Sequence, residues 1–308
     1  MSRATARIVL EQGTLRWSSP TTLNDPYDNK FDLHLDHDHE EVRRLALAKL
    51  WDDYSGIEPA PAVNATGILV RVLRERVPGM SRAQLEAHLG PSIEDGLRSG
   101  DRTIDQFHRD IRPAMATNKL LCLTTNPINT LMWAYYAEHH QGVVLRFRCV
   151  DGGDSPWPAG KAVVYSKQMP RLFDAESLSD LLAGRASIDP MSAMYKIVFT
   201  KSIDWAHECE WRIFAGSGRN PNTSYEDIGF GTEELDGVVL GIRMPQGDRE
   251  AITEIAKRRY PHAKRLENVT RDREFGLDIH PSPLDHPTGE IRSPHRRCGA
   301  PKADLMPT

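Results

Sequence analysis

Residues 208–214, ECEWRIF, combine two carboxylates and a guanidinium at alternate positions, Glu208, Glu210 and Arg212. If the segment is a β-strand, these three side chains share one face and the apolar side chains share the other. Two carboxylates in one site repel each other, so the pKa of one of them rises unless Arg212 compensates. Such a row can transfer protons or stabilise a cation. The alternative is a solvated surface row, whose Glu–Arg pair would contribute little to stability.

A second polar group is predicted in TLRWSSPTTLNDPYD, residues 14–28. Alternation along TLRWS places Arg16 and Ser18 on one face, and Asn24 and Asp25 stand before a proline in a turn. The planar fork of an arginine can make two parallel hydrogen bonds to a pyrophosphate. The segment is interpreted either as the polar rim of an anion-binding site or as a well-capped loop beneath a sheet.

Residues 122–147 are predicted to contain a short helix, LMWAYYAEHH, between two strands. Tyr136 and His140 are four residues apart, so they share a helix face on which they could flank a planar ring. Gly142 stands where a glycine would end that helix. The alternative is a helix whose aromatic residues, Trp133 above all, pack in the core, with histidines that suit the negative end of the helix dipole.

Two further signals are discounted. HLDHDHE, residues 34–40, is rich in metal-ligand side chains, but so short a polar run fixes no coordination geometry, and no metal is expected. GSG at 216–218 and GFG at 229–231 lack the third glycine and the strand–helix context of a nucleotide-binding fingerprint. The sequence also contains no Walker, GxSxG, HExxH or EF-hand motif.

The scaffold that must position these segments changes its hydrophobic pattern along the chain. Residues 40–115 carry apolar residues at helical spacing and predict three to four short helices, punctuated by Gly90 and Pro91 among others. Strand-like and helical segments then follow. The pattern predicts one α+β domain over residues 1–280, with a mixed sheet at its core and a helical block inserted at 40–115. Residues 281–308 are rich in proline and charge, which predicts a disordered tail.

The composition argues against several classes of protein. The 308 residues have a formal net charge of −4, whereas domains that bind nucleic acid through bulk charge are usually strongly basic. No run approaches the ~20 apolar residues of a membrane helix, and the N-terminus has no signal-peptide core. Cys122, Cys149 and Cys209 stand in apolar runs without CxxC spacing and are predicted to be buried thiols. We expect a cytoplasmic protein with no membrane partner and no strong nucleic-acid signal.

Together, these segments resemble a bacterial family that is known only as a domain of unknown function. The resemblance rests on SSPTTLNDPYD, LMWAYYAEHHQGVVLRF, VVYS at 163–166, FTKSIDWAHECEWRI at 199–213 and VVLGIRMP at 238–245. It covers residues 10–245, with the helical block as the variable part. The combination of NDPYD, MWAYYA and ECEWR is specific to that family, and it implies no established activity.

The order of three motifs is also similar to that in ADP-ribosyltransferases of the arginine–serine–glutamate type. Arg16 resembles their early-strand arginine, LTT around Thr124 resembles their Ser-Thr-Ser strand, and ECE resembles their Glu-x-Glu. The resemblance implies that Arg16 holds the phosphates of NAD. It also implies that Glu210 stabilises the ribose oxocarbenium ion as nicotinamide leaves, while Glu208 orients the acceptor.

The leading hypothesis is therefore an NAD-dependent ADP-ribosyltransferase-like enzyme, a bacterial toxin or defence effector, with Glu210 and Glu208 as catalytic residues and NAD as substrate. The expected binding residues are Arg16, Ser18, Asn24, Asp25, Thr124, Tyr136, His140 and Arg212. Two other classes stay open. One is a non-enzymatic module that binds a small nucleotide-like ligand or a partner. The other is a hydrolase that uses the two glutamates on a phosphate or glycosidic ester. The macromolecular acceptor is not defined by the sequence.

Overall fold

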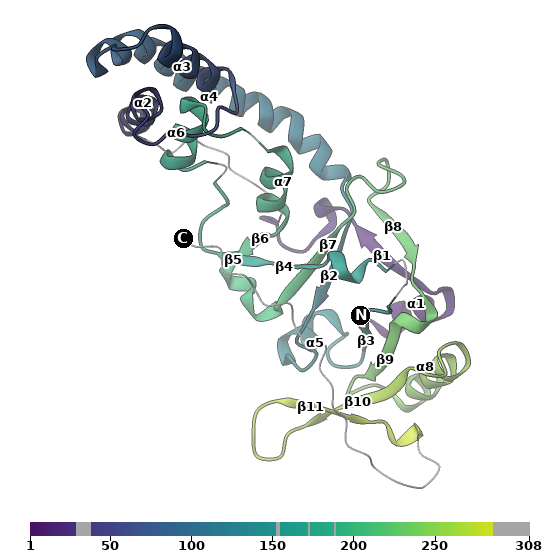
Figure 1. Ribbon diagram of the computed structural model, residues 1–308. Coiled ribbons are helices and arrows are strands. Elements are labelled where there is room, and N and C mark those ends of the chain that lie inside the picture. Colours follow the sequence, from purple (N-terminus) through teal and green to yellow (C-terminus); the bar gives the residue numbers. More distant parts are fainter. Residues whose placement is uncertain (29–37, 152–154, 172, 188, 286–308) are drawn as a thin grey trace.

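Two β-sheets pack against each other, and a lobe of helices extends from one end of them (Figure 1). The computed structural model describes residues 1–28, 38–151, 155–171, 173–187 and 189–285. It contains helices together with antiparallel and mixed sheets, which confirms the expected α+β class.

The larger sheet is antiparallel throughout and has five strands. In spatial order these are β4 (Lys161–Ala162), β7 (Glu210–Phe214), β2 (Leu120–Thr124), β1 (Thr14–Ser18) and β8 (Tyr225–Gly229). In β1, alternation holds as predicted, since Leu15 and Trp17 are buried and Arg16 is exposed. In β7, neighbouring Arg212 and Ile213 are both buried, because protein covers both faces of that strand.

The smaller sheet is mixed and has four strands. In spatial order these are β11 (Leu277–Pro281), β10 (Lys264–Thr270), β9 (Leu235–Leu240) and β3 (Val143–Phe147). β9 and β10 are parallel, and α8 (Gln246–Arg259) connects them, because parallel neighbours need a crossover. Ile252 and Ala256 bury one face of α8 in the cluster that includes β9.

A short parallel pair lies beside the larger sheet, with two helices between its strands in the chain. These elements are β5 (Val164–Ser166), α6 (Ala175–Ala183), α7 (Pro190–Val198) and β6 (Thr200–Ser202). β6 leads directly into the turn that precedes β7, so its position decides how the residues around Glu208 enter the larger sheet.

The helical lobe occupies the region expected of the helical block (Figure 1). Its helices from that region are α2 (His39–Ser55), α3 (Ala65–Arg76) and α4 (Arg82–Thr117), and α6 packs with them. The expectation of several short helices is wrong for its second half, because α4 continues through Gly90 and Pro91 for 36 residues.

Tertiary packing explains why Pro91 does not end α4. A proline inside a helix removes one backbone hydrogen bond and favours a break or kink. Apolar side chains on both sides of Pro91 nevertheless lie on one stripe that packs in the cluster shared with α2 and α6. That stripe consists of Leu85, Leu89, Ile93 and Leu97.

The chain ends and one edge strand also differ from the sequence-based expectations. The sequence pattern predicts neither α1 (Arg3–Gln12), which begins after the capping residue Ser2, nor the edge strand β8. The predicted tail begins too early, because Pro281 still pairs in β11 and Ser282 is fully buried. The rest of the predicted tail, residues 286–308, lies outside the described residues.

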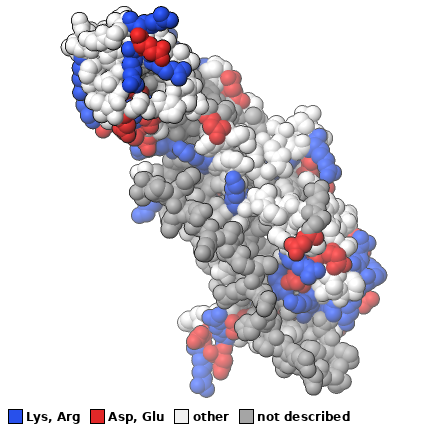
Figure 2. All heavy atoms as spheres, viewed as in Figure 1, with Lys and Arg blue, Asp and Glu red and all other residues white. Residues whose placement is uncertain are grey.

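Charged side chains of both signs are interleaved on the face seen in Figure 2. They gather over the helical lobe and over α1 and α8 (Figure 2). Over α1 and α8, Arg3 and Arg7 both pair with Asp248, and Arg258 pairs with Glu11. The positive charge there is balanced locally, as the near-neutral composition suggests.

An apolar cluster joins the two sheets. Trp17, Leu121 and Ile213 of the larger sheet pack with Leu145 and Phe147 of β3. Such a shared core fixes the separation and the angle of the two sheets. The polar ends of β1, β2 and β7 are therefore held at a constant distance from β3.

Gly241, which follows β9, lies in close contact with the neighbouring backbone. Its N–H donates to the carbonyl oxygen of Gly142, and a Cβ there would overlap the carbonyl group of His140. We expect Gly241→Ala to lower the free energy of unfolding by about 1–3 kcal/mol, as overpacking does.

Gly247→Ala is the matched control, because nothing lies within 4 Å of its Cβ position and it stands in α8. Alanine there is expected to be neutral or to stabilise by up to about 1 kcal/mol. Urea denaturation of both variants checks the prediction, and equal stabilities would contradict it.

Candidate functional site

Five charged side chains form one buried cluster, made by Asp28, Lys201, Glu208, Glu210 and Arg212. Lys201 Nζ lies 2.5 Å from Oε2 of Glu208 and 2.9 Å from Oε2 of Glu210. Nε of Arg212 lies 2.7 Å from Oε1 of Glu210, and its terminal nitrogen lies 2.6 Å from Oδ2 of Asp28. Three carboxylates therefore share two cations, which leaves one negative charge in excess when all five groups are ionised.

The two glutamates reach the cluster by different routes. Glu210 and Arg212 lie on one face of β7, as alternation predicts, but the strand begins only at Glu210. Glu208 ends a 3-10 helix, Ile203–Glu208, and Cys209 follows in the left-handed region with φ of 48°. This turn, rather than strand alternation, brings Glu208 beside Glu210. The row is not a solvated surface, because Arg212 is completely buried and both glutamates nearly so.

Hydrogen bonds from the neighbouring elements hold the turn. Thr124 at the end of β2 donates through Oγ1 to the carbonyl oxygen of Glu208 at 2.6 Å. Asn129, which caps α5 (Thr130–Tyr136), donates through Nδ2 to the carbonyl oxygen of His207 at 2.5 Å. Two adjacent carbonyl groups at the end of the 3-10 helix are thereby tied to the end of β2 and to the cap of α5.

The ionisation of the cluster follows from burial and from the two cations. Burial opposes the charge on Glu210, but hydrogen bonds and charges from Arg212 and Lys201 outweigh it, so the pKa of Glu210 lies below its usual value. Burial also opposes the charge on Lys201, yet the two glutamates raise its pKa. For Asp28 burial prevails over Arg212, and its pKa is raised. The cluster holds Glu210 ionised and makes Asp28 easier to protonate than an ordinary aspartate.

Tyr136 joins α5 to this cluster. Its hydroxyl donates to Oε1 of Glu208 at 2.7 Å and accepts a hydrogen bond from Nδ2 of Asn24 at 3.2 Å. Burial, and after it the hydrogen bond to Glu208, raises the pKa of Tyr136 to about 12. The phenol is therefore protonated at neutral pH and fixes the orientation of the Glu208 carboxylate.

A cavity of about 840 Å³ lies between the two sheets and opens onto the cluster. This volume is in the range of small-molecule sites. We call it the cleft. Its wall includes Lys201, Trp205, Glu208 and Glu210, and it also includes apolar residues of β1, β2 and β3. The cleft therefore combines an apolar surface with a few converging polar groups.

Five of the sequence-predicted binding residues line the cleft with both glutamates. They are Arg16, Asn24, Asp25, Thr124 and Tyr136. Segments that are far apart in the sequence thus converge. Asp25 is buried, and its Oδ1 accepts a hydrogen bond from Tyr27 N–H, whereas its Oδ2 has no hydrogen-bond partner among the described residues.

Arg16 already holds a carboxylate. Its Nε and one terminal nitrogen donate to the two oxygens of Asp227 at 2.9 Å and 3.0 Å. The guanidinium also lies 3.8 Å from the ring centre of Tyr225. The guanidinium that was expected to bind a pyrophosphate therefore contacts Asp227 and Tyr225 of β8 in this structure.

Three predicted binding residues, Ser18, His140 and Arg212, do not belong to the cleft wall. Arg212 has no exposed surface, so it positions Glu210 and does not contact a ligand. Its third contact, to the carbonyl oxygen of Val198 at 2.7 Å, extends the cluster to the end of α7. Ser18 ends β1 and pairs with Leu120 and with the edge strand.

The expectation that Tyr136 and His140 share a helix face is wrong, because α5 ends at Tyr136. Glu138, His139 and His140 follow in the left-handed region, with φ of 50°, 55° and 68°. His140 consequently points away from the cleft and lines a second cavity. Gly142 does not end the helix either. Its missing Cβ allows a close approach to the backbone of Ala137.

The cysteines also differ from the expectation of buried thiols, since Cys122, Cys149 and Cys209 are exposed. Cys122 lines the cleft. The protein around its sulfur, and after it the charge of Glu210, raise the pKa of the Cys122 thiol. A protonated thiol is a poor nucleophile at neutral pH, so the Cys122 thiol is poorly suited to act as a nucleophile in the cleft.

Sequence reasoning missed Lys201 and Asp28. Both stand in segments that it examined, FTKSIDW and NDPYD, but local spacing does not show that they meet the glutamates. The one available signal is electrostatic. Buried carboxylates need compensating charges, and Arg212 alone does not balance two glutamates.

Residues 132–213, from α5 to β7, match the model of a family described as "Protein of unknown function (DUF2971)". The matched segment contains Tyr136, Lys201, Glu208, Glu210 and Arg212. The expected resemblance to a family of unknown function is thereby confirmed for this part of the chain. No curated protein and no solved structure matched the chain. The resemblance to ADP-ribosyltransferases stays a prediction.

Within the described ranges, no three His, Cys, Asp or Glu side chains gather as metal ligands would. In the HLDHDHE segment, Asp38 caps α2 and His39 begins it, and residues 34–37 lie outside the described chain. None of the helices described here combines the length and apolar character needed to cross a membrane.

Removal of Arg212 should be costly for folding. Arg212→Ala leaves Glu210 and Asp28 buried without their main partner, and breaking a buried ion pair in this way costs about 3–5 kcal/mol. Arg219→Ala in an exposed loop is the matched control and should change stability by less than about 0.5 kcal/mol. Chemical denaturation measures both values, and similar small losses would refute the structural role of Arg212.

Tyr136 should ionise at a higher pH than a free tyrosine. Its pKa of about 12 means that tyrosinate absorbance in wild type minus Tyr136→Phe stays flat through the range in which a free tyrosine, with a pKa of about 10, ionises. Because the folded-state pKa is raised, the phenol stabilises the fold below that ordinary value, and this contribution disappears as the pH rises through the folded value. Glu208→Gln removes the carboxylate that accepts the hydrogen bond, and it should lower the pKa of Tyr136. A difference signal near the ordinary pKa of tyrosine would contradict the bond to Glu208.

Proposed function

We propose that the protein is an NAD-dependent ADP-ribosyltransferase-like enzyme that binds NAD in the cleft. In that reaction the bond between ribose C1′ and nicotinamide breaks, and its electron pair leaves with nicotinamide. The acceptor then bonds to C1′ and loses its proton. Positive charge develops on the ribose between these events, so negative charge held nearby lowers the barrier.

The observation that carries the proposal is the pair Glu208 and Glu210 on the wall of a nucleotide-sized cleft. The cluster has one negative charge in excess when all five groups are ionised, and Arg212 keeps Glu210 ionised. A carboxylate that is already ionised and immobile needs little reorganisation when a cation forms beside it. Glu210 is therefore assigned to stabilise the oxocarbenium ion.

Glu208 is assigned to orient the acceptor. Among the described residues, its carboxylate bonds to Tyr136 and Lys201 only, whereas that of Glu210 receives two bonds from Arg212 as well as one from Lys201. A carboxylate oxygen can accept two hydrogen bonds. Glu208 thus keeps more capacity to accept a bond from an incoming hydroxyl or amine.

The phosphates are assigned to the arginines of the cleft, Arg16, Arg146 and Arg148. Arg146 pairs with Asp236 through one terminal nitrogen, and its buried Nε has no partner among the described residues. An unsatisfied charged donor in a cavity wall favours an anionic ligand. Binding through Arg16 requires that its bonds to Asp227 be shared or released.

A second candidate is a module that binds a nucleotide-like ligand without turnover. The observation that favours it is the completeness of the cluster. Every carboxylate oxygen of Glu208 and Glu210 already accepts a hydrogen bond from a protein group. Such a cluster can be purely structural, with Trp205 and Asp25 left to bind the ligand.

Nicotinamide release from NAD tests the proposal. Glu210→Gln keeps the shape of the side chain, removes its charge and should lower the rate about 10²–10³-fold, as the loss of one transition-state contact does. Glu75→Gln, on the exposed surface of α3, is the matched control and should keep the wild-type rate. Circular dichroism confirms that each variant is folded.

Three outcomes separate the candidates. Loss of release in a folded Glu210→Gln variant supports the enzyme. Saturable NAD binding without release, in wild type as well, supports the binding module. Release that persists in Glu210→Gln removes this glutamate from the mechanism.

A further inference from the structure

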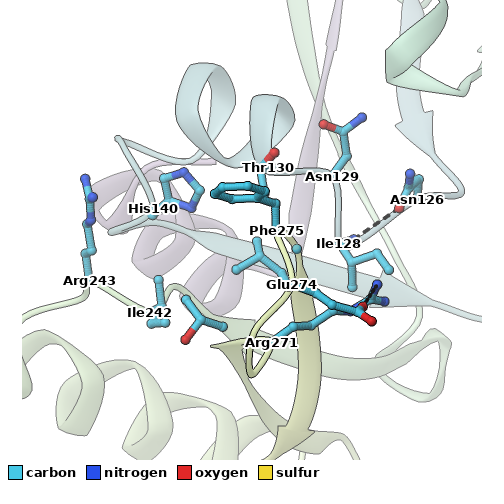
Figure 3. Close-up of a pocket in the computed structure, with 13 residues that line it drawn as sticks. Asn126, Ile128, Asn129, Thr130, His140, Ile242, Arg243, Arg271, Glu274 and Phe275 are labelled. Atoms are coloured by element: carbon cyan, nitrogen blue, oxygen red, sulfur yellow. Dashed lines mark hydrogen bonds and ion pairs between the residues drawn. The ribbon is translucent and has the colours of Figure 1, made fainter.

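A second cavity, of about 690 Å³, lies beyond α5 (Figure 3). The segment before α5, the turn after it, the residues that follow β9 and the hairpin of β10 and β11 enclose it. Its polar wall contains His140, Arg243 and Arg271, and its floor includes Ile128, Ile242 and Leu277. None of these residues takes part in the function proposed for the cleft.

The backbone places His140 in this wall at some cost. Three successive non-glycine residues, Glu138 to His140, occupy the left-handed region, where side chains crowd the backbone. Arg3 binds Glu138 through two side-chain contacts, and Arg243 N–H donates to the carbonyl oxygen of His140 at 3.0 Å. Strained backbone that is held in this way clusters at functional sites.

Two polar groups of the wall lack partners in the described parts of the chain. His140 Nδ1 is buried without a hydrogen-bond partner. The Arg243 guanidinium has no carboxylate partner there either, in contrast to Arg271, which lies 3.0 Å from Asp278. Burial, and after it the charge of Arg243, lowers the pKa of His140, so the imidazole is neutral at pH 7 and offers a hydrogen bond beside a free positive charge.

An exposed aromatic ring lies on the hairpin side of the cavity. Phe275 stands in the loop between β10 and β11 and is fully exposed. In Figure 3 its ring projects from the loop toward His140 and Thr130. An aromatic ring in this position offers a flat apolar surface against which a planar group can stack.

We propose that this cavity is a binding site for a nucleoside phosphate. The phosphate lies at Arg243 and His140, and the base stacks against Phe275. An arginine and an adjacent hydrogen-bonding group suit the oxygens of a phosphate, and the cavity is large enough for the nucleoside. A flexible acidic peptide, whose charges are spread along its chain, would meet only one uncompensated cation here, because Arg271 is paired with Asp278 and Glu274.

Isothermal titration of the full chain with AMP tests the proposal. Arg243→Ala and Phe275→Ala remove the two contacts, and each should weaken the binding of AMP about tenfold, equivalent to 1.4 kcal/mol. Arg273→Ala, on the same hairpin but exposed and outside the cavity wall, is the matched control and should leave the Kd unchanged. Arg16→Ala reports on the cleft and should also leave this component unchanged.

Inorganic phosphate and adenosine separate the two halves of the ligand. Each should bind at least about tenfold more weakly than AMP, because each makes only one of the two contacts. The proposal is overturned if no saturable component depends on both Arg243 and Phe275. It is also overturned if the only binding depends on Arg16, or if phosphate or adenosine alone equals AMP. NAD turnover is measured separately, so failure here leaves the function proposed for the cleft unaffected.

Discussion

The buried guanidinium of Arg212 is the constraint on which the site depends. A fully buried charge is tolerated only when partners surround it. Here the partners come from three places in the chain, namely Glu210 on the same strand, Asp28 near the N-terminus and the carbonyl oxygen of Val198 at the end of α7. One side chain therefore fixes the larger sheet, the loop after β1 and the helix before β6 relative to one another.

Lys201 extends this constraint into the cleft. It bridges Glu208 and Glu210, which would otherwise repel each other across a short gap. Lys201 offsets this repulsion, and together with Arg212 it lowers the pKa of Glu210, so the Glu210 carboxylate stays ionised in a partly apolar cavity. Lys201 holds both glutamates in place, Arg212 holds Glu210 in addition, and Tyr136 holds Glu208.

The short helix α5 separates the two cavities. Tyr136 projects from it toward Glu208, and the left-handed turn after it carries His140 to the other side. Asn129 caps the helix and also holds the turn before Glu208. The family match begins inside this helix and ends in β7, so the matched segment contains the wall between the cavities and every cluster residue except Asp28.

Local sequence pattern was enough to predict the helices of residues 40–115 and the polar faces of β1 and β7. Alternation in β7 correctly placed Glu210 and Arg212 on one face, and alternation in β1 correctly separated Arg16 from Leu15 and Trp17. The apolar spacing of residues 40–115 correctly indicated helices. The contacts that those side chains make depend on how distant segments pack. Burial of an apolar stripe carried α4 through Pro91, and a left-handed turn removed His140 from the face of Tyr136. The partners of the glutamates were likewise out of reach of the sequence pattern, because a salt bridge between distant segments is set by how the whole chain packs and leaves no periodic signal.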